Sequence, residues 1–248
     1  MYRRANIVKL IDVHSHILPG IDDGSEDLEE SKSMLELAYN QGIRTIIATP
    51  HYRRGQNIDE LKRLTGLLRQ EAKKLDPEFG IFLGQELMDS EDTLEELLQG
   101  KALTMAESRY VLIEFYPGVS YNRLCQRLRQ LQMAGFIPIV AHAERYACLR
   151  ESGQERLEEL IEAGNRIQMN YRSLSGSLLD KRTRWCRRQV QKGNVHLLGT
   201  DMHNTGSRAP ETEESIKWME KHCTRRQLYR LIRKNAESIL EKKEGMER

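Results

Sequence analysis

The chain has 248 residues, of which 39% are hydrophobic and 31% charged, a composition typical of a globular protein with a sizeable core. Lys and Arg number 39 against 37 Asp and Glu, so the net charge of +2 offers no overall electrostatic case for a nucleic-acid or anionic membrane partner. No apolar run reaches the roughly 18 residues of a membrane-spanning helix, and the first residues lack the apolar segment of a signal peptide. We therefore expect a cytoplasmic protein without direct membrane insertion.

Apolar runs rich in β-branched residues alternate with amphipathic stretches of helical period. Seven runs are predicted to be strands: 7–13, 43–48, 80–83, 110–115, 137–141, 166–169 and 195–199. The helical stretches between them include 34–39, 58–75, 124–133, 157–161 and 179–190. This alternation with short joints predicts an α/β fold with a parallel sheet, and at this length a TIM-like barrel in one domain of residues 1–248. The segment from about 211 is predicted to be a helical tail packed on the outside of the barrel.

Acidic, imidazole and guanidinium side chains fall at the carboxyl ends of the predicted strands. The patterns His14-Ser15-His16 and Asp201-Met202-His203 close the first and last strands, and residues i and i+2 of a strand face the same side. The other strand ends carry His51, Glu86, Glu114, His142, Glu144 and Arg145, and only the sixth strand offers no evident ligand. The carboxyl ends of the strands form the active face in barrel enzymes, so we expect these groups to converge.

The histidines are informative together rather than singly. A lone histidine beside an apolar run is more often a packed core or surface residue than a ligand, and that alternative stays open for His51 or His142 alone. Five of the seven histidines, however, stand at predicted strand ends beside acids that are costly to bury unpaired. Imidazole and carboxylate ligands without thiolate suit Mn, Fe or Zn, and their number indicates two or three divalent ions. Such a cluster can activate water and neutralise an oxyanion, as phosphoester hydrolysis requires.

Two arginines and a turn lie beside these ligand candidates. Arg145 directly follows Glu144, and Arg208 comes shortly after the last strand. Both can hold phosphoryl oxygens with their planar donors, and a plain surface salt bridge is the open alternative for each. In the turn, Asp22 is expected to form an Asx-type turn, whereas Asp23 can reach the metals.

Six motifs occur in the order and with the spacing of a known family. They are HSHILPGIDDG (14–24), ATPHYRRG (48–55), GQEL (84–87), SRYVLIEF (108–115), VAHAERY (140–146) and TDMHNTGSRAP (200–210). Over about 200 residues the chain thereby resembles the PHP-type tyrosine-protein phosphatases of bacterial capsular and exopolysaccharide loci, the CpsB and YwqE group.

The resemblance implies a distorted (β/α)7 barrel of PHP type, usually with manganese, that hydrolyses phosphotyrosine on a partner protein, a bacterial tyrosine autokinase. By motif match Arg145 and Arg208 would bind phosphate, Glu86 would bridge ions, and Glu144 would support the ligands. The metal ligands would be His14, His16, Asp23, His51, Glu86, Glu114, His142, Asp201 and His203. The oligomeric state is left open.

The cysteine spacing is consistent with hydrolysis that depends on metal ions and not on a cysteine nucleophile. Cys125, Cys148, Cys186 and Cys223 form no C-x-x-C pair, so neither a disulfide framework nor a zinc–thiolate site is indicated. None is followed at the sixth position by arginine, which excludes the C-x5-R thiolate loop of the commonest tyrosine phosphatases. A phenolate with a pKa near 10 also leaves with little acid assistance.

Other functions stay open at this point. A phosphatase for a small phosphomonoester is the main alternative, because related PHP proteins use similar metal sites. A nuclease would need a basic groove that the composition does not supply, and a metal-bound scaffold would bind phosphorylated partners without turnover. Tyr116, Tyr121 and Tyr171 follow strand ends, where they could border a phosphotyrosine ring or simply pack.

Overall fold

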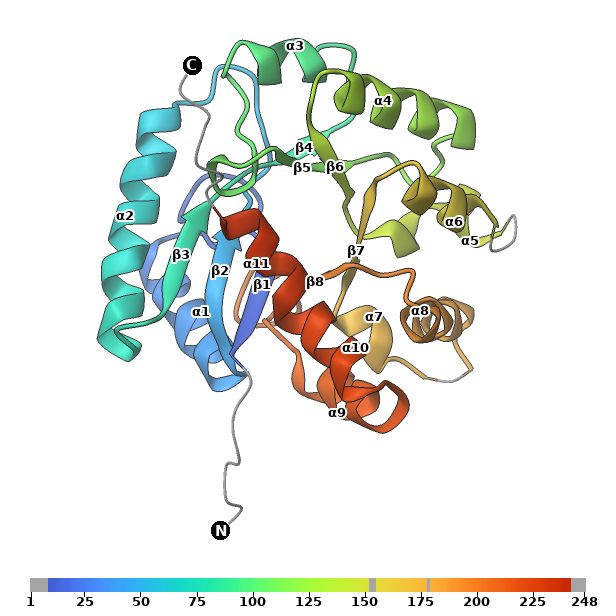
Figure 1. The fold of residues 1–248 in the computed structure, drawn as a ribbon. Coiled ribbons are helices and arrows are strands. Elements are labelled where there is room, and N and C mark those ends of the chain that lie inside the picture. The colour runs from blue at the N-terminus through green and yellow to red at the C-terminus, as the bar shows by residue number, and fades with distance from the viewer. Residues whose placement is uncertain (1–8, 152–154, 178, 242–248) are drawn as a thin grey trace.

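The structure, a computed structural model, describes residues 9–151, 155–177 and 179–241. Parallel strands form a ring, and helices surround it (Figure 1). The strands are β1 (Leu10–Ser15), β2 (Ile43–Ala48), β3 (Gly80–Leu83), β4 (Glu86–Met88), β5 (Tyr110–Glu114), β6 (Ile137–Val140), β7 (Arg166–Asn170) and β8 (Leu197–Gly199).

The helices follow the strands along the chain. The α-helices are α1 (Leu28–Asn40), α2 (Ile58–Leu75), α3 (Thr93–Leu98), α4 (Tyr121–Met133), α5 (Ala147–Arg150), α6 (Glu155–Glu162), α7 (Arg172–Ser175), α8 (Lys181–Lys192), α9 (Glu213–His222), α10 (Arg225–Tyr229) and α11 (Asn235–Leu240). Two short 3-10 helices, Met105–Glu107 and Ala143–Arg145, and a π-helix, Arg230–Lys234, complete them. No helix in the described part of the chain is both long and apolar enough to cross a bilayer.

Local sequence explains why the longer helices form where they do. The α2 segment begins after Asn57, whose side chain accepts hydrogen bonds from two backbone N–H groups of the first turn. Its residues Leu61, Leu64 and Leu68 recur at helical spacing and are all buried against the strands. After α8, Gly193 has a φ of 83° and ends the helix in the left-handed region that favours glycine.

Backbone hydrogen bonds close the ring between two sheets. One sheet has the order β1-β2-β3 and the other β4-β5-β6-β7-β8. The His16 N–H donates to the Met202 carbonyl at 2.9 Å, which joins the ends of β1 and β8. The Gly84 N–H donates to the Ala48 carbonyl at 2.8 Å, so the chain after β3 stays beside β2 and continues into β4. The third predicted strand therefore extends into a second short segment, β4, that pairs with β5.

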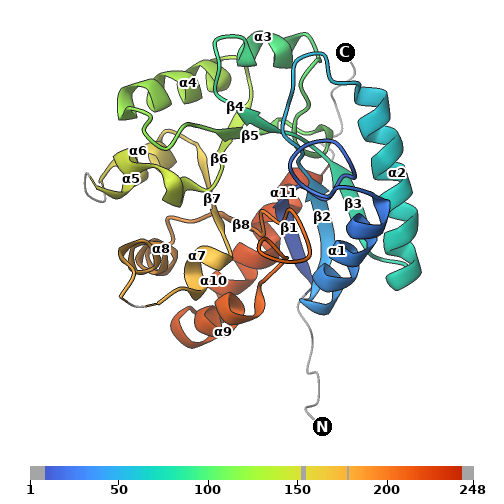
Figure 2. The ribbon, with the colours of Figure 1, turned by 180° about the vertical axis from the view of Figure 1, so that it is seen from behind.

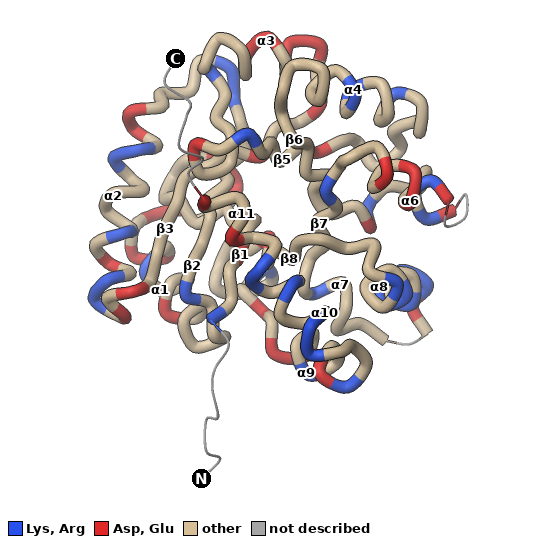
Figure 3. The backbone as a smooth tube through the Cα atoms, in the orientation of Figure 1, with Lys and Arg blue, Asp and Glu red and all other residues tan. Residues whose placement is uncertain are grey.

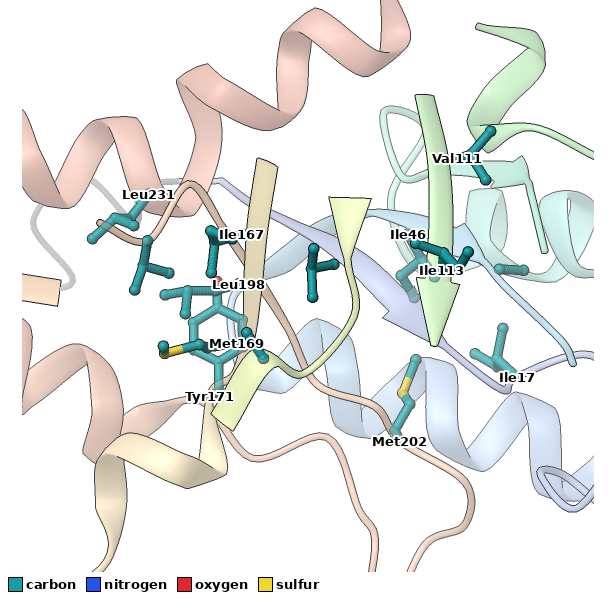
Figure 4. Packing of buried hydrophobic residues seen from close by; sticks show 14 of the residues in the cluster. Ile17, Ile46, Val111, Ile113, Ile167, Met169, Tyr171, Leu198, Met202 and Leu231 are labelled. Carbon is teal, nitrogen blue, oxygen red and sulfur yellow. The ribbon is translucent and has the colours of Figure 1, made fainter. Parts of the chain in front are cut away.

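Alternating strand residues face two separate apolar layers. Ile46, Ile113 and Leu198 point away from the ring into the layer between strands and helices, which Figure 4 shows together with other members of that cluster. Residues of the opposite parity fill the ring itself. That inner layer contains Ile11, Val13, Ile47, Met105, Leu112, Ile139, Ala141 and Leu197. The ring is thus a packed core, and the site groups must lie at one of its ends.

The C-terminal helices contribute to both layers. Ala236 and Ile239 of α11 belong to the inner cluster, so α11 covers the end of the ring from which the strands start. Figure 2 shows α11 behind the ring when the molecule is viewed from the opposite side. The Ser215 hydroxyl of α9 donates to the Tyr171 carbonyl, and α9 packs beside α7. The tail is therefore not confined to the outside of the barrel, since its last helix closes one end.

The α/β fold with parallel strands is confirmed. All seven predicted strands are present, with ends that differ by a few residues, and the part of the first prediction before residue 9 lies outside the described residues. The separate segment β4 and the short helices α3, α5 and α7 were not predicted, because elements of three to six residues carry too little periodic signal.

Candidate metal centre

The nine ligand candidates gather at the carboxyl ends of the strands. Seven of them form three overlapping groups in which one ligand atom per residue lies within 4.8 Å of the others. The groups are His16, Asp23, His51 and His203; His14, His16 and Glu86; and His51, Glu86 and Glu114. The remaining two, His142 and Asp201, contact members of these groups. The side chains at the strand ends therefore converge at one end of the barrel, as expected.

Glu86 stands at the middle of the cluster. Its Oε2 lies 3.1 Å from His14 Nε2, 3.2 Å from His16 Nε2 and 3.2 Å from His51 Nδ1. Its Oε1 lies 2.9 Å from His142 Nε2. The side chain is 1% exposed, so a charged carboxylate here depends on the groups around it. Glu86 is the residue best placed to be shared between ions.

A second set of ligand atoms surrounds Asp23 and Asp201. Asp23 Oδ1 is 3.5 Å from both His51 Nε2 and His203 Nε2, and its side chain is 59% exposed. Asp201 Oδ1 lies 3.6 Å from His16 Nε2 and 3.7 Å from His203 Nδ1. His51 thus offers one nitrogen to the Glu86 side and the other to the Asp23 side. The ligand atoms therefore fall into more than one group, and the groups share His16, His51 and Glu86.

Asp22 fixes the orientation of two histidine-bearing segments. Its Oδ2 accepts a hydrogen bond from His16 Nδ1 at 2.7 Å and from the His51 N–H at 2.9 Å, and its Oδ1 accepts from the Gly24 N–H in the predicted Asx turn. Burial opposes the charge, but these hydrogen bonds lower the pKa of Asp22 to about 2. A Cβ at Gly24 would stand 2.1 Å from the His16 carbonyl oxygen, so glycine is required there. The Nε2 atom of His16 is therefore held toward the site, where a bound cation would take the place of its proton.

Strand β7 supplies orienting amides instead of ligands. Gln168 Oε1 accepts from the His142 N–H at 2.6 Å and lies 3.3 Å from His14 Nδ1. Asn170 Nδ2 donates to Asp201 Oδ2 at 2.8 Å. These two residues were missed from the sequence, although polar side chains at i and i+2 of a buried apolar strand were the available signal. The sixth predicted strand is thus part of the site.

Glu144 holds the strand that carries these amides. Its Oε1 accepts from the Asn170 N–H at 3.0 Å and from the Ser173 hydroxyl at 2.6 Å. It lies outside the groups of converging ligand atoms in the described residues. Its position is that of a support for Asn170 and, through it, for Asp201.

His203 offers a direct test of whether a cation fits. Its Nδ1 lies 3.0 Å from the Asp201 carbonyl oxygen, which can only accept, so Nδ1 carries the hydrogen. Its Nε2 is then an acceptor, and it is buried without a hydrogen-bond partner among the described residues. Burial and the neighbouring His16 lower the pKa of His203 to about 4, so the ring is neutral. A buried lone pair facing a carboxylate, without a proton between them, is what a metal ion would satisfy.

Negative charge is in excess at the site. Five carboxylates face two guanidinium groups, which leaves three uncompensated negative charges while the imidazoles are neutral: Asp22, Asp23, Glu86, Glu114 and Asp201 against Arg145 and Arg208. Burial disfavours a charged His16, yet its hydrogen bonds to Asp22 and Glu86 raise its pKa to about 10. A proton on His16 thus offsets part of the excess negative charge, and bound divalent ions can offset this charge instead.

The two arginines lie at the mouth of the cluster. An Arg145 Nη2 hydrogen bond reaches Asp201 Oδ2, and Nη1 lies 3.6 Å from Glu114. Arg208 Nη2 donates to Asp201 Oδ1 at 2.8 Å, and Nη1 lies 3.9 Å from Asp23. Both side chains are 34% exposed. They are anchored to ligand candidates rather than to unrelated surface acids, and they keep donors open to solvent.

Two site residues have unusual backbone conformations. Asp201 has a φ of 54° and His142 a φ of 28°, which is the left-handed region that non-glycine residues rarely adopt. Such positions cost about 1–3 kcal/mol and persist only where surrounding contacts hold them. A Cβ on Gly199 would stand 2.5 Å from His14 Cβ, so the strand before Asp201 must approach β1 closely. The backbone here is shaped to bring these side chains together.

The three tyrosines after strand ends differ in position. Tyr171 is fully buried, so of the two alternatives left open for it packing in the core is the one that holds. Tyr121 donates to Glu159 at 2.6 Å. Tyr116, by contrast, is 68% exposed and follows Glu114 by two residues.

The family model of capsular polysaccharide synthesis proteins CpsB/CapC matches residues 10–241. This chain belongs to the CpsB/CapC family. Among its relatives, the tyrosine-protein phosphatase CpsB of Streptococcus pneumoniae is 36% identical over 83% of this chain and 88% of its own length. The tyrosine-protein phosphatase YwqE of Bacillus subtilis is 33% identical over 93% of this chain and 91% of its own. The family resemblance read from the six motifs is thereby confirmed.

Solved structures agree with this assignment. A structure from a study of YwqE of B. subtilis and CpsB of S. pneumoniae, described as unique metal-dependent tyrosine phosphatases, superimposes with a TM-score of 0.83 at 32% identity and covers 93% of this chain and 94% of the other. A dihydroorotase from Campylobacter jejuni superimposes with a TM-score of 0.63 at 12% identity, over 95% of this chain and 84% of its own. The second likeness concerns the barrel fold alone.

Proposed function

We propose that this chain is a metal-dependent protein-tyrosine phosphatase that hydrolyses phosphotyrosine on a partner protein in capsule or exopolysaccharide synthesis. Relatives in the same family carry this activity in their names and align over more than 80% of both chains. The observation that carries the proposal is the gathering of nine imidazole and carboxylate side chains with two guanidinium groups at one end of the barrel. Such a donor set has no thiolate and suits hard or borderline divalent ions.

The proposed ligands are the nine side chains already placed at that end. Two or three ions would be held, with Glu86 shared between them because its two oxygens face four histidines. Manganese is the proposed metal, with iron or zinc as alternatives. When bound, these ions supply Lewis acidity that lowers the pKa of water and offsets the charge of a phosphoryl group.

Arg145 and Arg208 are proposed to bind the phosphoryl oxygens. Each guanidinium is fixed by Asp201 from one side, and each is open to solvent on the other. A planar guanidinium donates two parallel hydrogen bonds to a phosphate and retains its charge at any working pH. The two residues therefore orient the phosphoryl group over the cluster, and Asn170 keeps their shared anchor in place.

The substrate class follows from the leaving group. Phenol has a pKa near 10, so a tyrosine phenolate leaves without a strong general acid. The carboxylates of the site lie among imidazoles and guanidiniums, and the pKa values of Glu86 and Asp201 are lowered, so neither is a proton donor near neutral pH. Tyr116, which is exposed and follows Glu114 by two residues, is proposed to contact the ring of the substrate tyrosine.

The partner and the setting belong to the same proposal. A bacterial tyrosine autokinase of the capsule locus is the proposed phosphorylated partner, and a cytoplasmic location follows from a substrate that is phosphorylated with ATP. Residues 1–248 are proposed to form one phosphatase domain, because the last helix completes the interior cluster of the barrel.

The test compares phosphate release from a phosphotyrosyl peptide before and after chelation and after readdition of manganese. We expect turnover that disappears with the chelator and returns with the metal. Phosphoseryl peptides and small phosphomonoesters serve as competing substrates in the same assay. A higher kcat/KM for a small phosphomonoester would instead assign the site to metabolite hydrolysis, and no metal-dependent turnover at all would refute the proposal.

A further inference from the structure

A cavity lies at the opposite end of the barrel from the metal centre. It has a volume of about 400 Å³ and lies between the starts of β5, β7 and β8 and the segment from Arg230 to Ser238. We call it the basal cavity. Its lining includes Tyr110, Arg166, His196 and Arg230. Figure 3 shows basic positions in the stretch between α10 and α11, beside this end of the ring.

Two guanidinium groups in the basal cavity have no counterion in the described part of the chain. Among the described residues, neither Arg166 nor Arg230 forms an ion pair or side-chain hydrogen bond. Lys234, which also lines the cavity, differs because its Nζ lies 3.2 Å from Glu237. Arg166 is half-buried at the start of β7, and it shares the inward face of that strand with Gln168, two residues on. The charge of Arg166 is therefore part of the barrel wall, whereas Arg230 is an exposed residue of the π-helix Arg230–Lys234 that lines the same cavity.

The pKa of a neighbouring histidine, His196, is affected by the same positive charges. His196 Nδ1 accepts a hydrogen bond from the Ile167 N–H at 3.2 Å, and Asn235 Nδ2 donates to the His196 carbonyl at 2.8 Å. Burial and the charges of Arg166 and Arg230 lower the pKa of His196 to about 4. The ring is thus neutral and adds no charge to that of the two arginines.

We propose that the basal cavity binds a small phosphorylated molecule, with its phosphate held by Arg166 and Arg230. Two guanidinium groups match the two charges of a phosphate monoester, and their planar donors match its oxygens. The Tyr110 hydroxyl and Ser238 hydroxyl, 3.2 Å apart, are further polar groups on the wall.

The size of the cavity favours an organic phosphate over the free ion. A volume of about 400 Å³ lies within the usual range for small-molecule sites and is several times what one phosphate needs. The ring of Tyr110 and the side chain of Leu197 provide apolar wall for the rest of the molecule. This site is separate from the proposed phosphatase centre, because it lies where the strands begin and not where they end.

The direct test is a tungstate soak of crystals of the manganese-loaded wild-type protein. We expect an anomalous tungsten peak within hydrogen-bond distance of the Arg166 and Arg230 guanidinium groups, in addition to any peak at the metal centre. Tungsten only at the metal centre, or only on unrelated surface residues, overturns the proposal.

Solution binding tests the same residues with an organic probe. Phenylphosphonate is suitable because its P–C bond resists hydrolysis, and calorimetry can count its sites on the full chain. For wild type we expect two sites, and for Arg166→Gln and for Arg230→Gln we expect one of them to weaken by about tenfold or more. Arg226→Gln, which changes an exposed arginine of α10 outside the cavity, is the matched control and should keep both sites.

Turnover of a phosphotyrosyl peptide separates this proposal from the proposed function. Equal kcat/KM for wild type and Arg166→Gln shows that the fold and the metal centre are intact, so a lost site is then a property of the basal cavity. Equal phenylphosphonate binding by wild type and both cavity variants refutes the basal site, whatever the phosphatase assay gives.

Discussion

The two ends of the barrel differ in charge, although the same strands supply both. Along β5 the inward residues run from Tyr110 through Leu112 to Glu114, and along β7 they run from Arg166 to Asn170. The carboxyl ends carry surplus acids and imidazoles. The opposite end carries Arg166 at the start of β7 and Arg230 of the π-helix beside it, neither of which has a counterion among the described residues. An apolar plug separates the two ends. The inward-facing positions thus include cation-binding groups at the carboxyl ends of the strands and an anion-binding group at the start of β7.

The contrast indicates which property of the protein a substitution at each end should alter. At the carboxyl ends several side chains are held by a second one, as His16 is by Asp22 and His14 by Gln168. At the starts of the strands, α11 closes the end of the barrel, and its Ile239 packs into the inner cluster. Changes at the first end should affect metal content and activity, and changes at the second should affect stability.

The largest effect is expected for Glu86→Gln. Its carboxylate faces four histidines, and the amide cannot compensate cationic charge. Loss of several kcal/mol of transition-state stabilisation corresponds to a fall in kcat on the order of a thousandfold. Metal analysis of the purified variant should show fewer ions per chain than wild type, and unchanged metal content would contradict the central position of Glu86.

Arg145→Lys should lower activity without removing metal. Lysine keeps the charge but loses the planar pair of donors, so we expect kcat/KM for a phosphotyrosyl peptide to fall about a hundredfold. Arg63→Lys changes an exposed arginine that pairs with Glu60 on α2 and is the matched control. Normal activity of Arg145→Lys would mean that this arginine only anchors Asp201.

Asp22→Asn should weaken metal binding while the fold persists. The amide still accepts a hydrogen bond from His16 Nδ1, but it removes the charge that fixes this imidazole. Loss of such an orienting partner typically costs about 10- to 100-fold in metal affinity. Competition with a chelator measures the affinity, and far-UV circular dichroism checks the fold. An affinity equal to wild type would show that Asp22 serves only the turn.

Ile239→Ala should reduce stability and leave the metal centre unchanged. The side chain is 1% exposed and joins the interior cluster from α11, and its truncation should cost about 2–4 kcal/mol of unfolding free energy. Urea denaturation measures the loss, with the 80% exposed Met133, changed to Ala, as control. A simultaneous loss of bound metal would show that the two ends are coupled.

Sequence patterns were sufficient for the wall of the barrel and for the ligand candidates. The strand ends at His14, His51 and His142 were identifiable because buried parallel strands are apolar runs, and a polar residue that ends such a run is conspicuous. Parallel pairing then brings distant residues to one end without any further information.

The supporting contacts could not be predicted in the same way. Gln168 and Asn170 occur within a strand, and their partners lie far away in the sequence. The placement of α11 across the ring depends on packing of Ala236 and Ile239 against residues from several strands. The basal cavity depends on where guanidinium groups meet in space, which local periodicity does not encode.

The central claim is that the cluster around Glu86 holds divalent ions, and anomalous diffraction from crystals of manganese-loaded protein tests it most directly. We expect two or three manganese peaks among the side chains of His14, His16, His51, His142 and His203 and their neighbouring carboxylates. Crystals saturated with manganese that show no peak in this cluster, or peaks only elsewhere on the protein, would contradict the account.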